Sequence, residues 1–158
     1  MNFSDLHRLL ADQPPGAVAF VGLGNADRGD DGAGLALLET LRSRPELSTA
    51  VFIAAGVTPE NVLGQLIRSG CRVVVFLDAG RWGGAPGEIA LLDGADVATV
   101  GFSTHTYSIR LVERYLEAAA RLTCHYVAIQ PLRTEPGAAL SDPVRRGIEV
   151  FVGEGADA

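Results

Sequence analysis

The stretch "AVAFVGLGNADRGDDGAGLALLETLR", residues 17–42, decides the fold. It opens with a nearly all-apolar run over residues 17–25, which is typical of a short strand covered on both faces. A glycine-rich loop follows, and from Asp31 onward the leucines recur at helical spacing until Pro45 ends the pattern. A strand, a loop and a helix in this order form the first half of a unit in which a helix connects two parallel strands.

The rest of the chain continues this alternation of strands and helices. Further strands are expected over residues 50–56, 72–80, 87–94 and 125–131, and further helices after Ser4, over residues 58–70 and 106–121, and from Ser141 onward. The alternation predicts a three-layer α/β fold, a mostly parallel twisted sheet with helices on both faces. The strand at 87–94 follows a glycine-rich turn that leaves no room for a crossover helix, so we expect it to be an antiparallel edge strand.

The domain organisation is predicted to be simple. Residues 1–16 form a helical extension that "PPG" closes, and residues 17–158 form a single α/β domain, a size that buries a sizeable core. The charged residues total 20% of the chain, which is ordinary for a globular protein.

Charge and composition exclude several classes of function. A net charge of −6 argues against nucleic acid and anionic membranes as partners, because both are bound through basic surfaces. No apolar run approaches the roughly 20 residues that span a bilayer, and the first residues lack the apolar core of a secretory signal. Cys71 and Cys124 fit no metal-binding spacing and are expected to be reduced thiols. We therefore expect a cytoplasmic protein that is not inserted in a membrane.

Acidic and imidazole side chains gather where the parallel strands end. Asp31 follows the first strand, Asp78 closes the strand at 72–80, and Gln130 closes the last one. His105 is the histidine that lies in a loop before a helix at this same edge, where ligands bind in such sheets. Two carboxylates and an imidazole suit a borderline divalent ion such as nickel or zinc, and they equally suit general acid–base catalysis.

Each of these residues also has a purely structural interpretation. Asp30 or Asp31 could cap the helix that follows, Asp78 could brace the next loop, and His105 on its own would be an ordinary loop histidine. A carboxylate at the end of so apolar a strand is costly to bury without a partner, which favours a functional role for Asp78.

The glycine loop does not match a dinucleotide-binding fingerprint. Asp27 occupies the third glycine position of that motif, and the three aspartates of the loop would repel a pyrophosphate. The loop is better suited to a cation or to a peptide that approaches the backbone closely. We expect no nucleotide cofactor.

Four motifs in order resemble those of the [NiFe]-hydrogenase maturation endopeptidases. They are "VGLGNADRGDDGAG" at 21–34, "VVVFLDAG" at 73–80, "STH" at 103–105 and "IQP" at 129–131. The resemblance extends over roughly residues 17–152. It implies a phosphorylase/hydrolase-like α/β fold and an aspartic-type endopeptidase that activates a hydrogenase by clipping a short C-terminal peptide from its large-subunit precursor.

The same resemblance implies roles for individual residues. The metal-binding and catalytic residues fall on Asp31, Asp78 and His105. The substrate-binding residues fall on Gln130 and on the glycine loop, at Gly22, Gly24, Asn25, Gly29, Asp30 and Gly32. The metal implied is nickel, which the precursor carries into the site, and other divalent ions are expected to substitute for it in vitro.

Two other functions remain open from the sequence. "GLGN" after an N-terminal strand also opens peptidyl-tRNA hydrolases, but these continue with an Arg-His-Asn segment and have a basic face, whereas this chain has Arg28-Gly29-Asp30 and a negative charge. A metal-binding chaperone or scaffold could use the same three side chains to carry nickel without cleaving a peptide.

Overall fold

The sheet has the predicted mixed topology. The computed structural model describes residues 1–93, 96–97, 101–102 and 106–153. Its main strands lie in the order β2-β1-β3-β6-β4, and the short β5 pairs with the end of β3. The strands are β1 (Val18–Leu23), β2 (Val51–Gly56), β3 (Val73–Arg81), β4 (Ile89–Leu92), β5 (Gly101–Phe102) and β6 (Thr123–Ile129).

Strand direction confirms the predicted antiparallel edge. β1 pairs in parallel with β2 and β3, and β3 pairs in parallel with β6. β4 is antiparallel to β6. The chain passes from the end of β3 to β4 through a turn over residues 82–88, with no helix between the two strands. The antiparallel pairing of β5 with β3 was not predicted, because a two-residue strand leaves no periodic pattern in the sequence.

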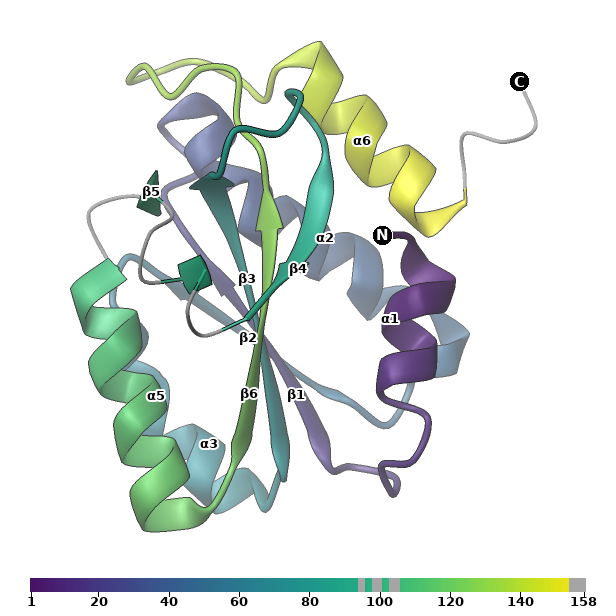
Figure 1. Ribbon diagram of the computed structural model, residues 1–158, viewed down its shortest axis with the longest axis vertical. Helices are drawn as coiled ribbons and strands as arrows, with labels where there is room; N and C mark the ends of the chain where they lie inside the picture. Colours follow the sequence, from purple (N-terminus) through teal and green to yellow (C-terminus); the bar gives the residue numbers. More distant parts are fainter. Residues whose placement is uncertain (94–95, 98–100, 103–105, 154–158) are drawn as a thin grey trace.

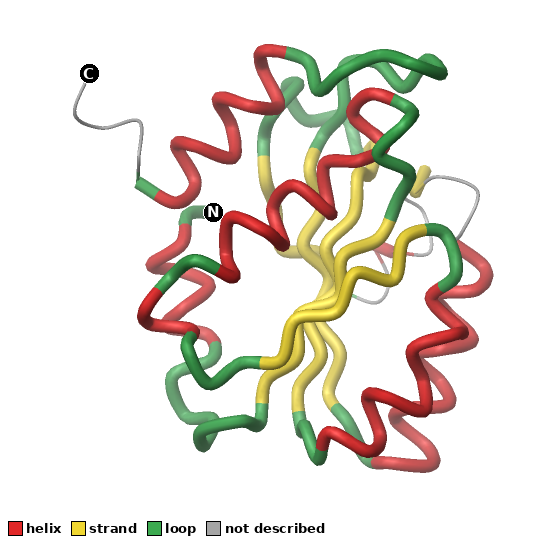
Figure 2. Tube along the Cα trace, turned by 180° about the vertical axis from the view of Figure 1, so that it is seen from behind, coloured by secondary structure: helices red, strands yellow, loops and turns green. Residues whose placement is uncertain are grey.

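Helices cover both faces of the sheet (Figures 1 and 2). The apolar side chains of three helices pack on one face, and those of two others pack on the opposite face. The first set is α1 (Phe3–Leu9), α2 (Ala33–Arg42) and α6 (Asp142–Val152), and the second is α3 (Leu63–Ser69) and α5 (Thr106–Ala120). Short 3₁₀ turns precede or follow these helices: η1 (Gly29–Gly32), η2 (Pro45–Leu47) and η3 (Pro59–Val62). None of the helices in the described residues is both long and apolar enough to cross a membrane.

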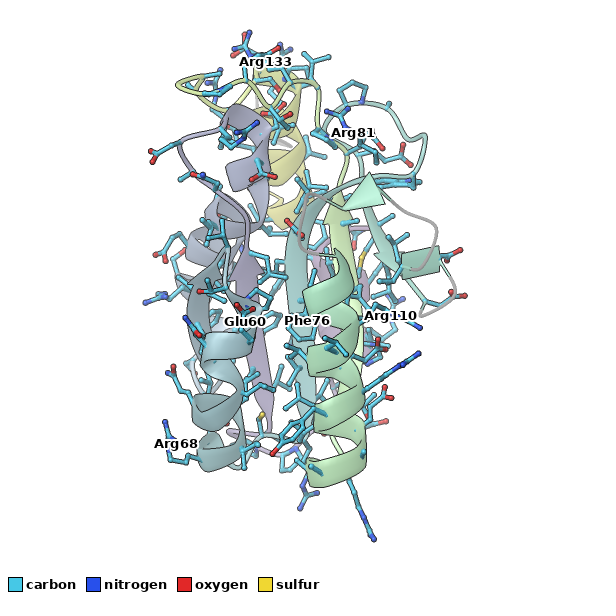
Figure 3. All side chains as sticks on the ribbon, turned by 90° about the vertical axis from the view of Figure 1, so that its left-hand side faces the viewer. Glu60, Arg68, Phe76, Arg81, Arg110 and Arg133 are labelled. Carbon is cyan, nitrogen blue, oxygen red and sulfur yellow. The ribbon has the colours of Figure 1, made fainter. Side chains whose placement is uncertain are left out.

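The central strand β3 is apolar throughout because both of its faces are buried. Val75 and Leu77 point into the core on the α2 side, whereas Val74 and Phe76 point into the core on the α5 side. The ring of Phe76, labelled in Figure 3, stacks on that of Tyr126 with ring centres 5.4 Å apart. The absence of an exposed face explains why this strand carries no alternation of polar and apolar residues.

Helix α2 approaches the sheet closely enough to require glycine. A Cβ on Gly34 would lie 2.2 Å from the carbonyl oxygen of Leu77 and 2.7 Å from that of Leu23. The first turn of α2 therefore rests directly on the ends of β1 and β3. This contact places η1, which immediately precedes α2, at the carboxyl edge of the sheet.

The predicted N-terminal helix is confirmed as α1. Its side chains Phe3 and Leu6 and its C-cap residue Leu10 are buried in the same core as those of α2 and α6. The guanidinium of Arg44 lies over the ring of Phe3, 4.5 Å from its centre. The separation of residues 1–16 from the domain at 17–158 stays a prediction, and α1 is packed against that domain.

Candidate functional site

The candidate site lies between β1 and β3, where the chain changes direction across the sheet. From β1 the chain proceeds to β2 on one side and then returns to β3 on the other side, and crevices at such points bind ligands. In Figure 3 the carboxyl edge of the sheet, where the site lies, is marked by Arg81, which ends β3, and by Arg133, which follows β6. Arg68, in the last turn of α3, marks the opposite end.

Gly24 lies where the glycine loop, at Asp31, approaches strand β3, at Asp78. It follows β1 with φ +113°, and its N–H donates to the carbonyl of Gly56 at 2.9 Å. A Cβ at this position would lie 1.9 Å from the carbonyl oxygen of Asp31 and 3.5 Å from Oδ1 of Asp78. The backbone carbonyl of Asp31 and the carboxyl group of Asp78 thus both lie beside Gly24. Only glycine fits at this position, because a Cβ would overlap the carbonyl oxygen of Asp31.

Asp78 is a buried carboxyl group that lacks a hydrogen-bond partner within the described residues. Its exposed fraction is 2%, and neither Oδ1 nor Oδ2 accepts a hydrogen bond there. Burial, and next the negative charge of Asp31, raise the pKa of Asp78 well above the usual value of an aspartate. A buried polar group left without a partner is costly to the fold, which keeps Asp78 a candidate for a functional role.

Asp31 is oriented by the glycine loop itself. Its Oδ2 accepts the N–H of Asn25 at 2.9 Å, and Oδ1 of Asn25 in turn accepts the N–H of Asp27 at 2.9 Å. Asn25 therefore stabilises the loop, whatever contact it makes with a substrate. Asp31 does not cap the helix as one interpretation expected, because the N-cap residue of α2 is Gly32 and no side chain caps this helix.

Asp30 has a structural role in the fold, and its predicted contact with a substrate stays a prediction. Its side chain is fully buried and bonds to the segment before α6. It accepts hydrogen bonds from the N–H groups of Leu132 and Arg133 and from the N–H and hydroxyl of Ser141. Burial alone would raise the pKa of Asp30, but these hydrogen bonds outweigh it and lower the pKa. Both oxygens of the carboxylate are engaged within the chain.

Gln130 likewise serves the fold at the edge of the site. Its Oε1 accepts the N–H groups of Trp82 at 3.1 Å and Gly84 at 3.2 Å, and its side chain is buried. Its backbone pairs with both Gly87 and Glu88. Gln130 therefore holds the turn that connects β3 to β4, and a contact between its side chain and a substrate stays a prediction.

The remaining glycines of the loop are buried against the chain. A Cβ on Gly22 would lie 3.0 Å from Cδ2 of Leu38, one on Gly29 would lie 2.9 Å from the carbonyl oxygen of Arg133, and one on Gly32 would lie 2.9 Å from Cα of Ala26. These contacts explain the glycines by packing, while their predicted contact with a substrate stays untested.

His105 falls outside the described residues, so its predicted meeting with the two carboxylates stays a prediction. Among the described residues no three histidine, cysteine, aspartate or glutamate side chains form a cluster that could hold a metal ion. Asp31 and Asp78 alone offer an incomplete set of ligands.

Neither cysteine is suited to act as a nucleophile at this site. Both are free, and Cys71 is buried. It precedes β3, at the edge of the sheet opposite to the site. Burial, and next the charge of Glu113, raise the pKa of the Cys124 thiol to about 12, which leaves little thiolate at neutral pH.

Comparison with known proteins identifies the family. A family model described as HycI, hydrogenase maturation protease, matches residues 35–157. The chain belongs to the hydrogenase maturation protease family. Its members are endopeptidases, so the chain is a hydrolase of peptide bonds. The match begins just after the glycine loop, and it includes Asp78 and His105.

Individual members of the hydrogenase maturation protease family agree with this assignment. The chain is 28% identical over 129 residues to the Hydrogenase 3 maturation protease of Escherichia coli K12, covering 80% of this chain and 81% of that protein. It superposes on the crystal structure of the [NiFe] hydrogenase maturation protease HycI from Thermococcus kodakarensis KOD1 with a TM-score of 0.76 and 26% identity, covering 92% of each chain. The hydrogenase maturating endopeptidase HybD from E. coli shares the fold, with a TM-score of 0.71, 23% identity and coverage of 85% and 86%.

Proposed function

We propose that this protein removes a short C-terminal peptide from the nickel-loaded precursor of a [NiFe]-hydrogenase large subunit, in the cytoplasm. Family membership supports the reaction class, and the buried carboxyl group of Asp78 beside Asp31 is the observation that carries the proposed recognition of the metal.

In this proposal Asp31, Asp78 and His105 approach the precursor's nickel from outside its own ligands. Contact with the ion positions the nearby peptide bond at the edge of the sheet, and positioning of this kind lowers the barrier of a reaction. The precursor's nickel, or one of the two carboxylates acting as base, activates a water molecule. Its oxygen adds to the peptide carbonyl, the C–N bond breaks, and the leaving amine takes up a proton.

Release of the peptide distinguishes this enzyme from a nickel chaperone. We expect that incubating the protein with a nickel-loaded large-subunit precursor shortens the precursor, and that intact-protein mass spectrometry detects both products of one cut near its C-terminus. We also expect the free protein to bind Ni²⁺ only weakly in calorimetric titration, because the substrate completes the site. Tight binding of Ni²⁺ without any shortening of the precursor would instead identify a carrier or scaffold.

A further inference from the structure

The segment that connects β6 to α6 is fastened to the glycine loop through one carboxylate. Oδ1 of Asp30 accepts the N–H of Ser141 at 2.7 Å, and Oδ2 accepts the hydroxyl of Ser141 at 2.7 Å. Oδ2 also accepts the N–H groups of Leu132 at 2.9 Å and of Arg133 at 3.1 Å. We call these four residues the Asp30 latch. Its bonds join parts of the chain that are more than 100 residues apart in sequence.

Backbone hydrogen bonds reinforce the latch on both sides of Asp30. The N–H of Asp30 donates to the carbonyl of Arg133 at 2.9 Å, and the N–H of Gly29 donates to that of Ala138 at 3.0 Å. In the other direction, the N–H of Gly137 donates to the carbonyl of Asp27 at 2.7 Å. The η1 turn is thus joined to the segment that crosses the carboxyl ends of the strands before α6 begins (Figure 1).

Asp31, the next residue, is held from the opposite side. Its carboxylate accepts the N–H of Asn25, and its carbonyl oxygen contacts the space beside Gly24. Two consecutive aspartates therefore face different ways, Asp30 into the protein and Asp31 into the loop that borders Asp78. Because a single peptide unit connects them, a rotation at Asp30 also turns Asp31.

The side chain of Ser141 bonds to Asp30 and does not cap its own helix. It occupies the N-cap position of α6, where a serine usually accepts a hydrogen bond from the first turn of the helix. It makes no such bond, and its hydroxyl donates to Asp30 instead. The residue that could stabilise α6 is engaged in holding the η1 turn.

We propose that Asp30 and Ser141 are positioning residues, and that the latch sets the direction in which Asp31 presents its carboxylate to the metal of the substrate. The proposal rests on the proposed function for what Asp31 contacts. The orientation of Asp31 is a property of the free protein and is measured without substrate.

Two variants test the latch, each with a spectroscopic and a kinetic measurement. Ser141→Ala removes one hydrogen bond to Asp30, and Asp30→Asn places an amide where the carboxylate accepts bonds from several donors. In a ¹H–¹⁵N NMR spectrum of the free protein, we expect the Asn25 amide proton to move upfield in both variants as its bond to Asp31 is lost. We expect kcat for cleavage of the nickel-loaded precursor to fall by roughly 10- to 100-fold, the cost of a displacement of about 1 Å in an active site.

Ser69→Ala is the matched control, because its hydroxyl donates to the carbonyl of Leu66 at 2.6 Å, at the end of α3 away from the site. It is expected to leave the Asn25 signal and kcat unchanged. Measurements are made below the melting temperature of every variant, confirmed by circular dichroism. If Ser141→Ala is folded with an unmoved Asn25 signal and normal kcat, the latch is only structural and the proposal is wrong. If the signal moves but even the unaltered protein cleaves no precursor, the latch is supported and the proposed function fails.

Discussion

Replacing Asp78 by asparagine is expected to abolish cleavage of the precursor while making the folded protein more stable. The variant loses the anionic group proposed to engage the metal, and the expected drop in kcat is roughly 10²–10⁴-fold, the contribution of a positioned acid or base. The fold gains because a carboxyl group with raised pKa and no described partner no longer has to be buried. Each unit of that pKa shift corresponds to about 1.4 kcal/mol. In a chain of this size about 1 kcal/mol raises Tm by roughly 2–4 °C.

The gain in stability is expected to depend on pH. Because the folded-state pKa of Asp78 is raised, the proton on this group favours the folded state, and its contribution is complete below the unfolded pKa of about 3.9. That contribution is lost as the pH rises through the folded-state pKa. Calorimetry should therefore find similar Tm values for the variant and the unaltered protein near pH 4, with a difference that grows toward neutral pH.

Asp12→Asn makes the same chemical change at an exposed position and is expected to alter neither cleavage nor Tm. An Asp78→Asn protein that cleaves at the normal rate would remove this residue from the proposed site. A Tm below that of the unaltered protein at pH 8 would show instead that the carboxylate is stabilised in the fold.

Replacing Gly24 by alanine is expected to cause the second largest loss of activity. The added Cβ would lie 1.9 Å from the carbonyl oxygen of Asp31, so the η1 turn has to move. The backbone at φ +113° is also one that a residue with a side chain rarely adopts. A displacement of Asp31 by about 1 Å predicts a loss of roughly 100-fold in kcat/KM for the nickel-loaded precursor.

Gly70→Ala separates this effect from backbone strain. Gly70 ends α3 with φ +73° and has open space where a Cβ would lie. The substitution is expected to lower stability by about 1–3 kcal/mol through strain alone and to leave kcat/KM unchanged where the protein is folded. Normal kinetics for Gly24→Ala would show that the approach of the loop to Asp78 is irrelevant to the reaction.

Much of the fold could be predicted because the determining patterns are local. The apolar runs of β1 and β3 and the helical spacing of the leucines in α2 each lie within a few residues, and the short turn before β4 excludes a crossover. Asp78 could be singled out for the same reason, because it follows five consecutive apolar residues of β3. Its burial beside Asp31 follows from the parallel pairing of β1 and β3.

The role of Asp30 could not be predicted because its partners are remote in sequence. Ser141 lies 111 residues away, at the start of a predicted helix. The structure keeps Ser141 at the N-cap position but directs its hydroxyl elsewhere. A similar choice occurs at Thr58, the N-cap residue of η3, whose hydroxyl donates to the carbonyl of Ala55 at 3.4 Å rather than capping the turn. Sequence patterns indicate where a cap belongs, but the fold decides which bond the side chain makes, through a long-range contact at Ser141 and a local one at Thr58.

The most direct measurement compares cleavage of the same large-subunit precursor with and without nickel. Both forms are incubated with the protein under identical conditions, and the released C-terminal peptide is quantified by mass spectrometry. If Asp31 and Asp78 must engage the nickel ion before the peptide bond is positioned, we expect only the nickel-loaded precursor to be shortened. Equal rates of cleavage for the two forms would contradict recognition of the metal and, with it, the role given to Asp31 and Asp78.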